Sequence, residues 1–273
     1  MKAKKIIFLP VFLCCFFKHS SGLNHSPDYG ARSAGLSNAS VTNRDLWSIS
    51  NNQAGASNIR KIETGVSYLD RFLIPEISFK SVVVAIPSPP GVFGLTYSSF
   101  GYRNFNENQV GLSFSKGIGK LLSLGIKFDY LSTRIADIYG SSGTFTGEAG
   151  LIIQPLKNLY IGCHIFNPSF SEISKTNEEK IPSIFRSGLA YDFAGKVYFC
   201  LELEKDLSYN PRYKAGIEWK VTKNFFLRTG ISSDPVENSF GLGVYLKNTK
   251  IDIACMTNQV AGISSGISIS LGF

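Results

Sequence analysis

The side chains that could carry chemistry in this chain of 273 residues are few and widely spaced. Its three histidines are His19, His25 and His164, and no two of them stand at the ligand spacing of a zinc site. Hydrolases combine a histidine with a serine or an acidic residue, and only His164 lies in a strand-like segment. A single histidine between Tyr160 and Phe166 is typical of a polar lining residue, so we expect no catalytic site, no metal site and no cofactor.

Paired carboxylates could also do acid–base work. Carboxylates and cations recur on the face that we predict to point inward in a series of strand-like segments: Asp129, Glu148, Glu202, Glu204 and Glu218, with Lys80, Lys127, Arg186, Lys214 and Arg228. Unpaired charges in a narrow interior would be costly. Mixed signs therefore predict ion pairs that, together with His164, line a filled or plugged lumen.

The first 22 residues have a different composition from the rest. A basic start is followed by an apolar run from Ile6 to Phe17 and by the small residues Ser20 to Gly22, which predicts a secretory signal peptide at 1–22. Its removal takes away four lysines and lowers the formal net charge from +8 by four, so a nucleic-acid partner is not indicated. Cys14 and Cys15 raise the alternative of lipidation, although the small pair of a lipobox is missing before them.

The three remaining cysteines, Cys163, Cys200 and Cys255, are far apart and form no CxxC pair. A disulfide framework needs an even and closely spaced set. We therefore interpret them as small apolar residues on strand faces.

From residue 62 to the end, apolar and small or polar residues alternate with a period of two. At the end of the chain, Ile267, Ile269, Leu271 and Phe273 share one face. No apolar run after residue 22 reaches the 18 residues of a helical span. About 14 segments alternate in this way, most of them as long as a tilted strand that crosses a bilayer: 62–69, 76–86, 92–101, 107–116, 121–134, 143–154, 158–167, 182–193, 196–206, 211–221, 224–232, 238–247, 250–258 and 262–273.

The connections between these segments alternate in length. Short turns follow the even-numbered segments, whereas longer connections, such as 135–142 and 167–181, follow several odd-numbered ones. This asymmetry is typical of outer-membrane barrels. We predict an all-β fold, a closed antiparallel transmembrane β-barrel of about 14 strands at 62–273, exported to the outer membrane. The terminal Phe273, in phase with Leu271, resembles the signal read by the outer-membrane assembly machinery, and we expect a monomer surrounded by outer-membrane lipid.

Residues 23–61 form a polar segment rich in glycine and asparagine. Its stretches Gly30-Ala31-Arg32-Ser33-Ala34-Gly35-Leu36 and Asn51-Asn52-Gln53-Ala54-Gly55 resemble the opening of the PorV/PorQ group of Bacteroidetes outer-membrane proteins, which is related to the FadL long-chain fatty acid transporters. The group usually has proline where this chain has Gln53. The resemblance implies a short, partly helical plug inside the lumen, with Gly30, Arg32, Gly35, Asn52, Ala54 and Gly55 as its motif residues. The alternative to a plug is a partly ordered periplasmic tail.

Two functions remain open. The PorV/PorQ resemblance implies a partner of secretion-system components, associated with type IX secretion and without catalysis. The alternative is a FadL-like channel or transporter for small or hydrophobic ligands.

Overall fold

The computed structural model describes residues 29–135, 140–174 and 179–273. The predicted signal peptide, Cys14 and Cys15 lie outside these ranges. No helix in the described ranges is long and apolar enough to cross a membrane.

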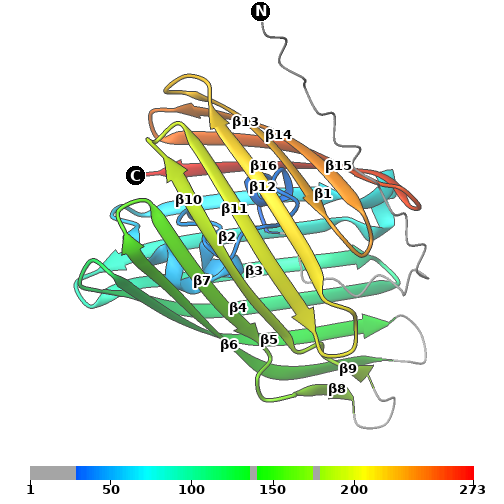
Figure 1. Ribbon diagram of the computed structural model, residues 1–273. Coiled ribbons are helices and arrows are strands. Elements are labelled where there is room, and N and C mark those ends of the chain that lie inside the picture. Colours follow the sequence, from blue (N-terminus) through cyan, green and yellow to red (C-terminus); the bar gives the residue numbers. More distant parts are fainter. Residues whose placement is uncertain (1–28, 136–139, 175–178) are drawn as a thin grey trace, which may run out of the picture.

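Fourteen of the strands in the described ranges close into one antiparallel barrel, in which β1 pairs with β16 and each strand pairs with its neighbours along the chain (Figure 1). The barrel strands are β1 (Glu63–Asp70), β2 (Phe79–Ser88), β3 (Gly91–Tyr102), β4 (Phe105–Ile118), β5 (Leu122–Ile135), β6 (Ser141–Leu156), β7 (Leu159–Phe166), β10 (Ile184–Phe193), β11 (Val197–Asp206), β12 (Arg212–Lys220), β13 (Phe225–Ser232), β14 (Glu237–Leu246), β15 (Thr249–Asn258) and β16 (Gly262–Gly272). The predicted fold class is thus confirmed.

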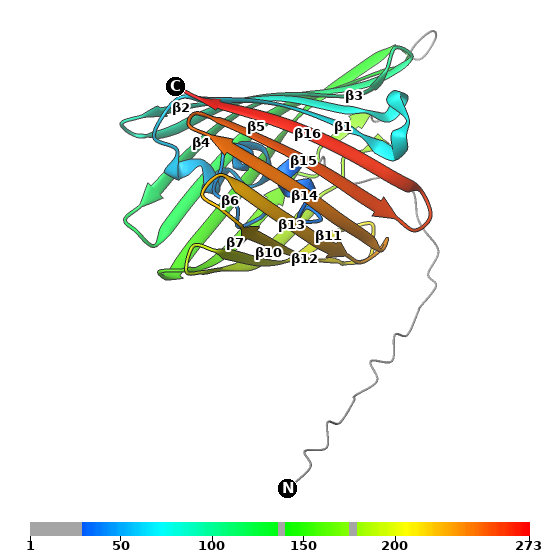
Figure 2. The ribbon, with the colours of Figure 1, turned by 90° about the horizontal axis from the view of Figure 1, so that it is seen from above.

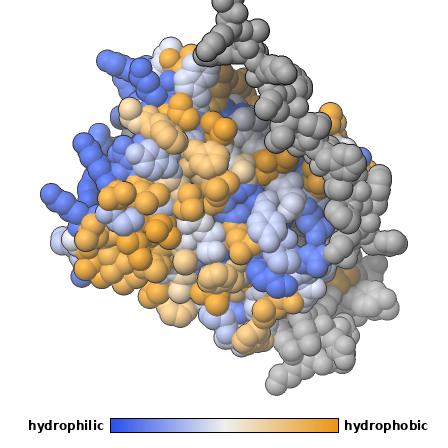
Figure 3. Space-filling model, in the orientation of Figure 1, coloured by the Kyte–Doolittle hydropathy of each residue, from blue (hydrophilic) through white to orange (hydrophobic). Residues whose placement is uncertain are grey.

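The alternation of the sequence becomes an inside and an outside of the barrel. In β16, Ser264, Ser268 and Ser270 are buried, whereas Ile267 and Ile269 are exposed. The same rule puts Leu, Ile, Val and Phe side chains on the outer surface of every wall strand, and Figure 3 shows apolar residues covering much of one face. An exposed apolar surface of this extent on a closed barrel is what lipid stabilises, so the fold is a transmembrane barrel.

The two ends of the barrel differ. At one end lie the turns 89–90, 119–121, 157–158, 194–196, 221–224 and 247–248, together with the C-terminus (Figure 1). We call this the short-turn end. At the other, the loop end, the connection 71–78 contains η2 (Arg71–Leu73) and η3 (Pro75–Ile77), and the connection 167–183 contains the small hairpin of β8 (Glu172–Ser174) and β9 (Glu179–Lys180).

Residues 29–59 lie inside the barrel and are called the plug here (Figure 2). They contain three short helices, α1 (Ala31–Ala34), α2 (Ser48–Asn51) and η1 (Gln53–Asn58). Most plug side chains are buried, although the segment is too small to form a core of its own. The plug therefore owes its order to the wall around it, and the interpretation of this segment as a periplasmic tail is wrong.

One strand, β2, differs from its prediction by three residues at its start, whereas the other barrel strands begin and end within two residues of theirs. The segment 76–86 was expected to alternate from residue 76, but Pro75–Ile77 form η3 and β2 begins at Phe79. The prediction that Lys80 faces the lumen is wrong, because Lys80 is exposed on the outer face that Val82 and Ile86 also occupy. The run Val82 to Val84 is apolar on both faces, so local alternation could not tell inside from outside there.

Candidate functional site

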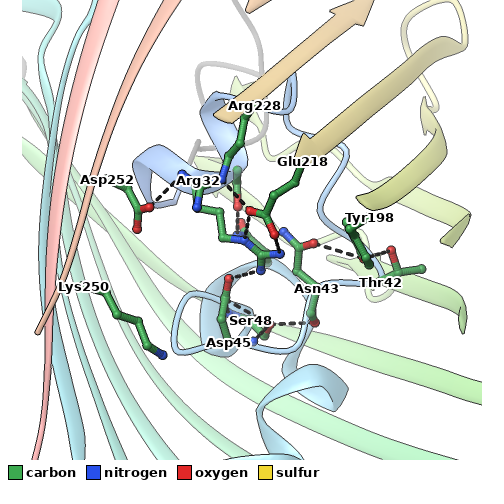
Figure 4. Close-up of polar contacts among 12 residues, drawn as sticks. Arg32, Thr42, Asn43, Asp45, Ser48, Tyr198, Glu218, Arg228, Lys250 and Asp252 are labelled. Carbon is green, nitrogen blue, oxygen red and sulfur yellow. Dashed lines mark hydrogen bonds and ion pairs between the residues drawn. The ribbon is translucent and has the colours of Figure 1, made fainter. Parts of the chain in front are cut away.

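Arg32 joins the plug to the barrel wall at strand β12 (Figure 4). Its Nε and Nη2 donate to the two carboxylate oxygens of Glu218 on β12, each at 2.8 Å, and its Nη1 donates to Asp45 Oδ2 at 2.7 Å. Glu218 also accepts from Arg228 on β13, and Arg228 in turn donates to Asp252 on β15 at 2.7 Å. Two cations and three carboxylates thus form one chain of ion pairs that runs from the plug across three wall strands.

Neighbouring carboxylates keep Arg32 in its charged form. Burial alone would lower the pKa of its guanidinium, but Glu218 and Asp45 together hold this pKa well above its ordinary value. The bidentate geometry with Glu218 is the one in which a guanidinium and a carboxylate pair best.

A second network surrounds Glu148 on β6. Its Oε1 accepts from Lys127 Nζ at 3.0 Å, and its Oε2 lies 2.9 Å from His164 Nε2. The plug reaches the same carboxylate through Gln53 Nε2, at 2.5 Å. Lys127 also pairs with Asp129, at 2.9 Å.

His164 is held at both ring nitrogens, because Arg186 Nη2 lies 3.0 Å from its Nδ1 and also donates to the backbone carbonyl of Asn51 in the plug. His164 is therefore fixed between Glu148 and Arg186 and buried under the plug. It lines the lumen and connects these two side chains of the wall. This position matches the lining role that its isolation in the sequence indicated.

At the loop-side start of the plug, Tyr29 Oη donates to Gln109 Oε1 at 3.0 Å, and Gln109 Nε2 donates to Asp129 Oδ1 at 2.8 Å. Burial raises the pKa of Tyr29 to about 12, so its hydroxyl keeps the proton that it donates.

A third network receives backbone groups of the plug. Glu202 Oε2 on β11 accepts from the amides of Ser40 and Val41, both at 2.7 Å. Lys214 on β12 pairs with Glu202 at 3.2 Å and with Glu204 at 2.7 Å. We call the three networks together the charged seat.

The other side of the plug is mainly apolar and holds the larger of its two apolar clusters, the smaller being Leu36 and Ala39 with Ala190 and Cys200 on the charged side. Tyr29, Ala31, Leu46, Trp47 and Ile49 pack in one continuous cluster. The wall supplies the remaining surface of this cluster from β1, β2, β3 and β15, with Leu69, Phe79, Val83, Ala85, Val92, Ala254 and Met256. We call this contact the apolar seam. It runs from Phe79, at the loop end of β2, to Val92, at the short-turn end of β3.

The predicted motif residues shape the plug. Gly30 has a φ of 82° and faces the ring of Trp47, where a Cβ would lie 2.5 Å from Cγ. Gly55 leaves room for the carbonyl of Asn43, which a Cβ would approach to 2.1 Å. Asn52 caps η1, because its Oδ1 accepts from Ala54 N while its Nδ2 donates to the carbonyl of Val41 at 2.6 Å.

Glycines of the wall leave room for the plug, and the sequence analysis does not single them out. Gly35 of the plug lies back to back with Gly241 on β14, where an added Cβ would come within 3.0 Å of the opposite Cα. Gly94 leaves space for Ile49, and Gly216 leaves space for Leu36. The signal that could have found them is glycine at inward positions of the predicted strands, such as Gly216 and Gly241.

Ten of the eleven residues predicted to face the lumen are buried inside the barrel; Lys80 alone is not. At the end of the chain, Leu271 is exposed on the outer surface, and Phe273 N donates to the carbonyl of Ile62 at 2.9 Å, next to the closing strand pair.

Among the described residues, no three His, Cys, Asp or Glu side chains gather in a way that could hold a metal ion. Cys163, Cys200 and Cys255 are free thiols.

No family model and no curated protein matches the chain. Solved structures do. The Pseudomonas putida toluene transporter TodX is 12% identical, with a TM-score of 0.69, over 90% of this chain and 98% of that one. The Ralstonia pickettii toluene transporter TbuX is 10% identical, with a TM-score of 0.70, over 90% and 98%. A Pseudomonas aeruginosa FadL homologue is 12% identical, with a TM-score of 0.64, over 90% and 99%.

These likenesses show a shared fold. They support the FadL-like part of the sequence-based expectation, whereas the PorV/PorQ assignment gains no support from them. The neighbours are described as transporters and channels and not as enzymes.

Proposed function

We propose that this chain is an outer-membrane passage protein in which the plug controls the entry of small apolar molecules. The observation that carries the proposal is the division of the plug's contacts between the charged seat and the apolar seam. The fold that the chain shares with two toluene transporters points to the same class of cargo.

The two sides of the plug resist separation for different reasons. Pulling the plug from the charged seat would take Arg32 from Glu218 and two amide donors from Glu202. Glu218 would keep only Arg228, and Glu202 only Lys214. Breaking a buried ion pair typically costs about 3–5 kcal/mol. Opening the apolar seam removes mainly dispersion contacts and apolar burial, of about 25 cal/mol per Å², together with the neutral hydrogen bonds from Tyr29 to Gln109 and from the amide of Ala31 to Ser268. An apolar molecule that enters the seam restores the apolar contacts, whereas a polar one does not. The seam is therefore the path that favours apolar cargo.

A pair of disulfide locks tests this path. In a background with Cys163, Cys200 and Cys255 replaced by Ala, the seam lock is Ile49→Cys with Gly94→Cys, because a Cβ at Gly94 would lie 2.6 Å from Ile49 Cγ2. The matched seat lock is Leu36→Cys with Gly216→Cys on the charged side, where the two Cβ positions lie 2.9 Å apart and a small shift of the plug away from the wall brings them to the roughly 3.5–4.5 Å of a disulfide. Both bridges would form during export, in an oxidising compartment.

The readout is uptake of the apolar dye 1-N-phenylnaphthylamine by a Gram-negative host with equal amounts of each barrel in its outer membrane. We expect the seam lock to return uptake to the level of the host alone, and a reducing agent to restore it. The seat lock should leave uptake unchanged. If the unlocked barrel gives no uptake above the host, or if the two locks act alike, the seam is not the path.

The secretion-associated role that the PorV/PorQ resemblance implies is the second candidate. It needs no opening of the plug, so uptake at the host level from the unlocked barrel would favour it.

A further inference from the structure

A cavity of about 970 Å³ lies at the short-turn end, between the plug and the turns that join β2 to β3, β4 to β5 and β6 to β7. Its charged lining is cationic throughout: Arg44, Arg60, Lys116, Lys120 and Lys157, with no acidic side chain among the lining residues. Neither the apolar seam nor the charged seat includes these five side chains.

Arg44 is held in place by an aromatic ring. Its guanidinium carbon lies 3.9 Å from the centre of the Tyr160 ring, and its Nη2 donates to Tyr160 Oη at 2.7 Å. Tyr160 is buried, whereas Arg44 is exposed. A guanidinium has five N–H donors, so most of those on Arg44 are free to bind a ligand. Arg44 also lines a neighbouring cavity of about 290 Å³, to which Lys196 and Lys220 contribute.

The cations of this cavity differ from those of the lumen. Lys127 and Lys214 each contact two carboxylates. Within the described ranges, no ion pair involves Arg44, Lys116 or Lys120, and the same holds for Lys157 and Arg60. Five like charges around one cavity repel one another, and a ligand with several negative charges removes that repulsion.

We propose that this cavity binds a phosphate-bearing ligand, either a soluble phosphorylated solute or the headgroup of an anionic phospholipid. Arg binds phosphate oxygens in a bidentate fashion, and Lys binds them as a point charge. A single carboxylate would neutralise one of the five cations, whereas a ligand with two or more phosphate charges engages several. The volume is at the upper end of the range of small-molecule pockets.

Calorimetric titration of the purified mature protein in non-ionic detergent with pyrophosphate tests the proposal. The cavity triple variant is Lys116→Gln with Lys120→Gln and Lys157→Gln. The matched control replaces three exposed lysines of the same end that line neither cavity: Lys61→Gln, Lys223→Gln and Lys247→Gln. We expect the cavity variant to bind pyrophosphate at least tenfold more weakly and the control less than twofold more weakly. Equal weakening in both would mean a diffuse basic surface and would overturn the site.

Native mass spectrometry of protein taken from phosphatidylglycerol nanodiscs identifies the source. A lipid retained on the wild type and on the control, but not on the cavity variant, identifies the headgroup. Pyrophosphate binding without lipid retention identifies the soluble solute. The proposal is wrong if neither pyrophosphate nor phosphatidylglycerol binds. This assay does not involve uptake of apolar molecules, so its outcome is independent of the proposed passage function.

Discussion

The wall strands β1, β2 and β3 meet the plug mainly with apolar side chains, whereas the wall strands from β5 to β13 meet it mainly with charged ones. A small apolar cluster of Leu36, Ala39, Ala190 and Cys200 lies among the charged contacts, and β15 contributes to both sides. Trp47 and Ile49 lie against Val83, Ala85 and their neighbours on the first side. Arg32 meets Glu218 on the second, while backbone amides of Ser40 and Val41 meet Glu202. Apolar contacts are tolerant of sliding, because they have no direction, whereas ion pairs with bidentate geometry define one position. The charged seat thus sets where the plug sits, and the apolar seam is the side at which the proposed function has the plug part from the wall.

Removing the whole plug, and with it both the charged and the apolar contacts, should have the largest effect on the permeability of the barrel. Deleting residues 30–57 takes away the plug, while the barrel strands from Glu63 onward keep their pairing. We expect the variant to assemble and to change from a closed barrel to one with steady conductance in planar bilayers. The heat-induced shift on unboiled gels is the control for folding. Conductance equal to that of the wild type would show that the plug does not seal the lumen.

Breaking the charged seat alone should have the next largest effect. Arg32→Met leaves the carboxylates of Glu218 and Asp45, which are 10% and 14% exposed, without their shared cation. We expect plug docking to weaken by about 3–5 kcal/mol. Arg32→Lys keeps the charge but loses the bidentate contact, so its loss should be intermediate.

Trp47 offers a direct measurement of docking. The chain has two tryptophans, of which Trp47 is 2% exposed in the plug and Trp219 is 50% exposed on the outer surface. In a Trp219→Phe background, a red shift of the emission with urea reports the exposure of Trp47. An unchanged midpoint in Arg32→Met would contradict the assigned role of the charged seat.

Shortening an apolar side chain of the seam should weaken plug docking less, and the loss of docking free energy should not depend on salt. Ile49 is fully buried, and Ile49→Ala should cost about 2–5 kcal/mol of docking, with Ile49→Val at about 0.5–1.5 kcal/mol. The same fluorescence assay measures both. If added salt shifts the midpoint of Ile49→Ala further than that of the wild type, the seam is not separate from the charged seat.

The smallest expected effect concerns the fit of backbone against backbone. Gly241→Ala places a Cβ 3.1 Å from Gly35 Cα, and overpacking of this kind typically costs about 1–3 kcal/mol. The matched control is Gly117→Ala, where nothing lies within 4 Å of the added Cβ, with an expected change within about 0.5 kcal/mol. Equal midpoints for the two variants would mean that the plug adjusts to the wall.

The strands could be predicted because their signal is local. The side chains of a strand point in turn to opposite faces. The alternation of residues such as Leu242 and Gly243 along β14 therefore indicates which face is outside and which is inside without knowledge of the partner strands. The exception has the same explanation. Around Val83 both faces are apolar, and only the closed barrel decides that Lys80 lies outside.

The place of the plug and its motif residues came only from the family resemblance, beside which a periplasmic tail stayed open, and the contacts of the plug did not follow from the sequence. That Arg32 would need an acidic partner follows from its burial. That the partner is Glu218, 186 positions later in the chain, depends on the register of strands that pair with each other and not with the plug. The apolar seam likewise requires residues as distant as Ile49 and Met256 to meet in one cluster. Periodicity and composition act over a few residues, so they determine the strands and their faces, whereas closing the barrel decides which charges pair, which glycines receive the plug and which side of the plug meets an apolar wall.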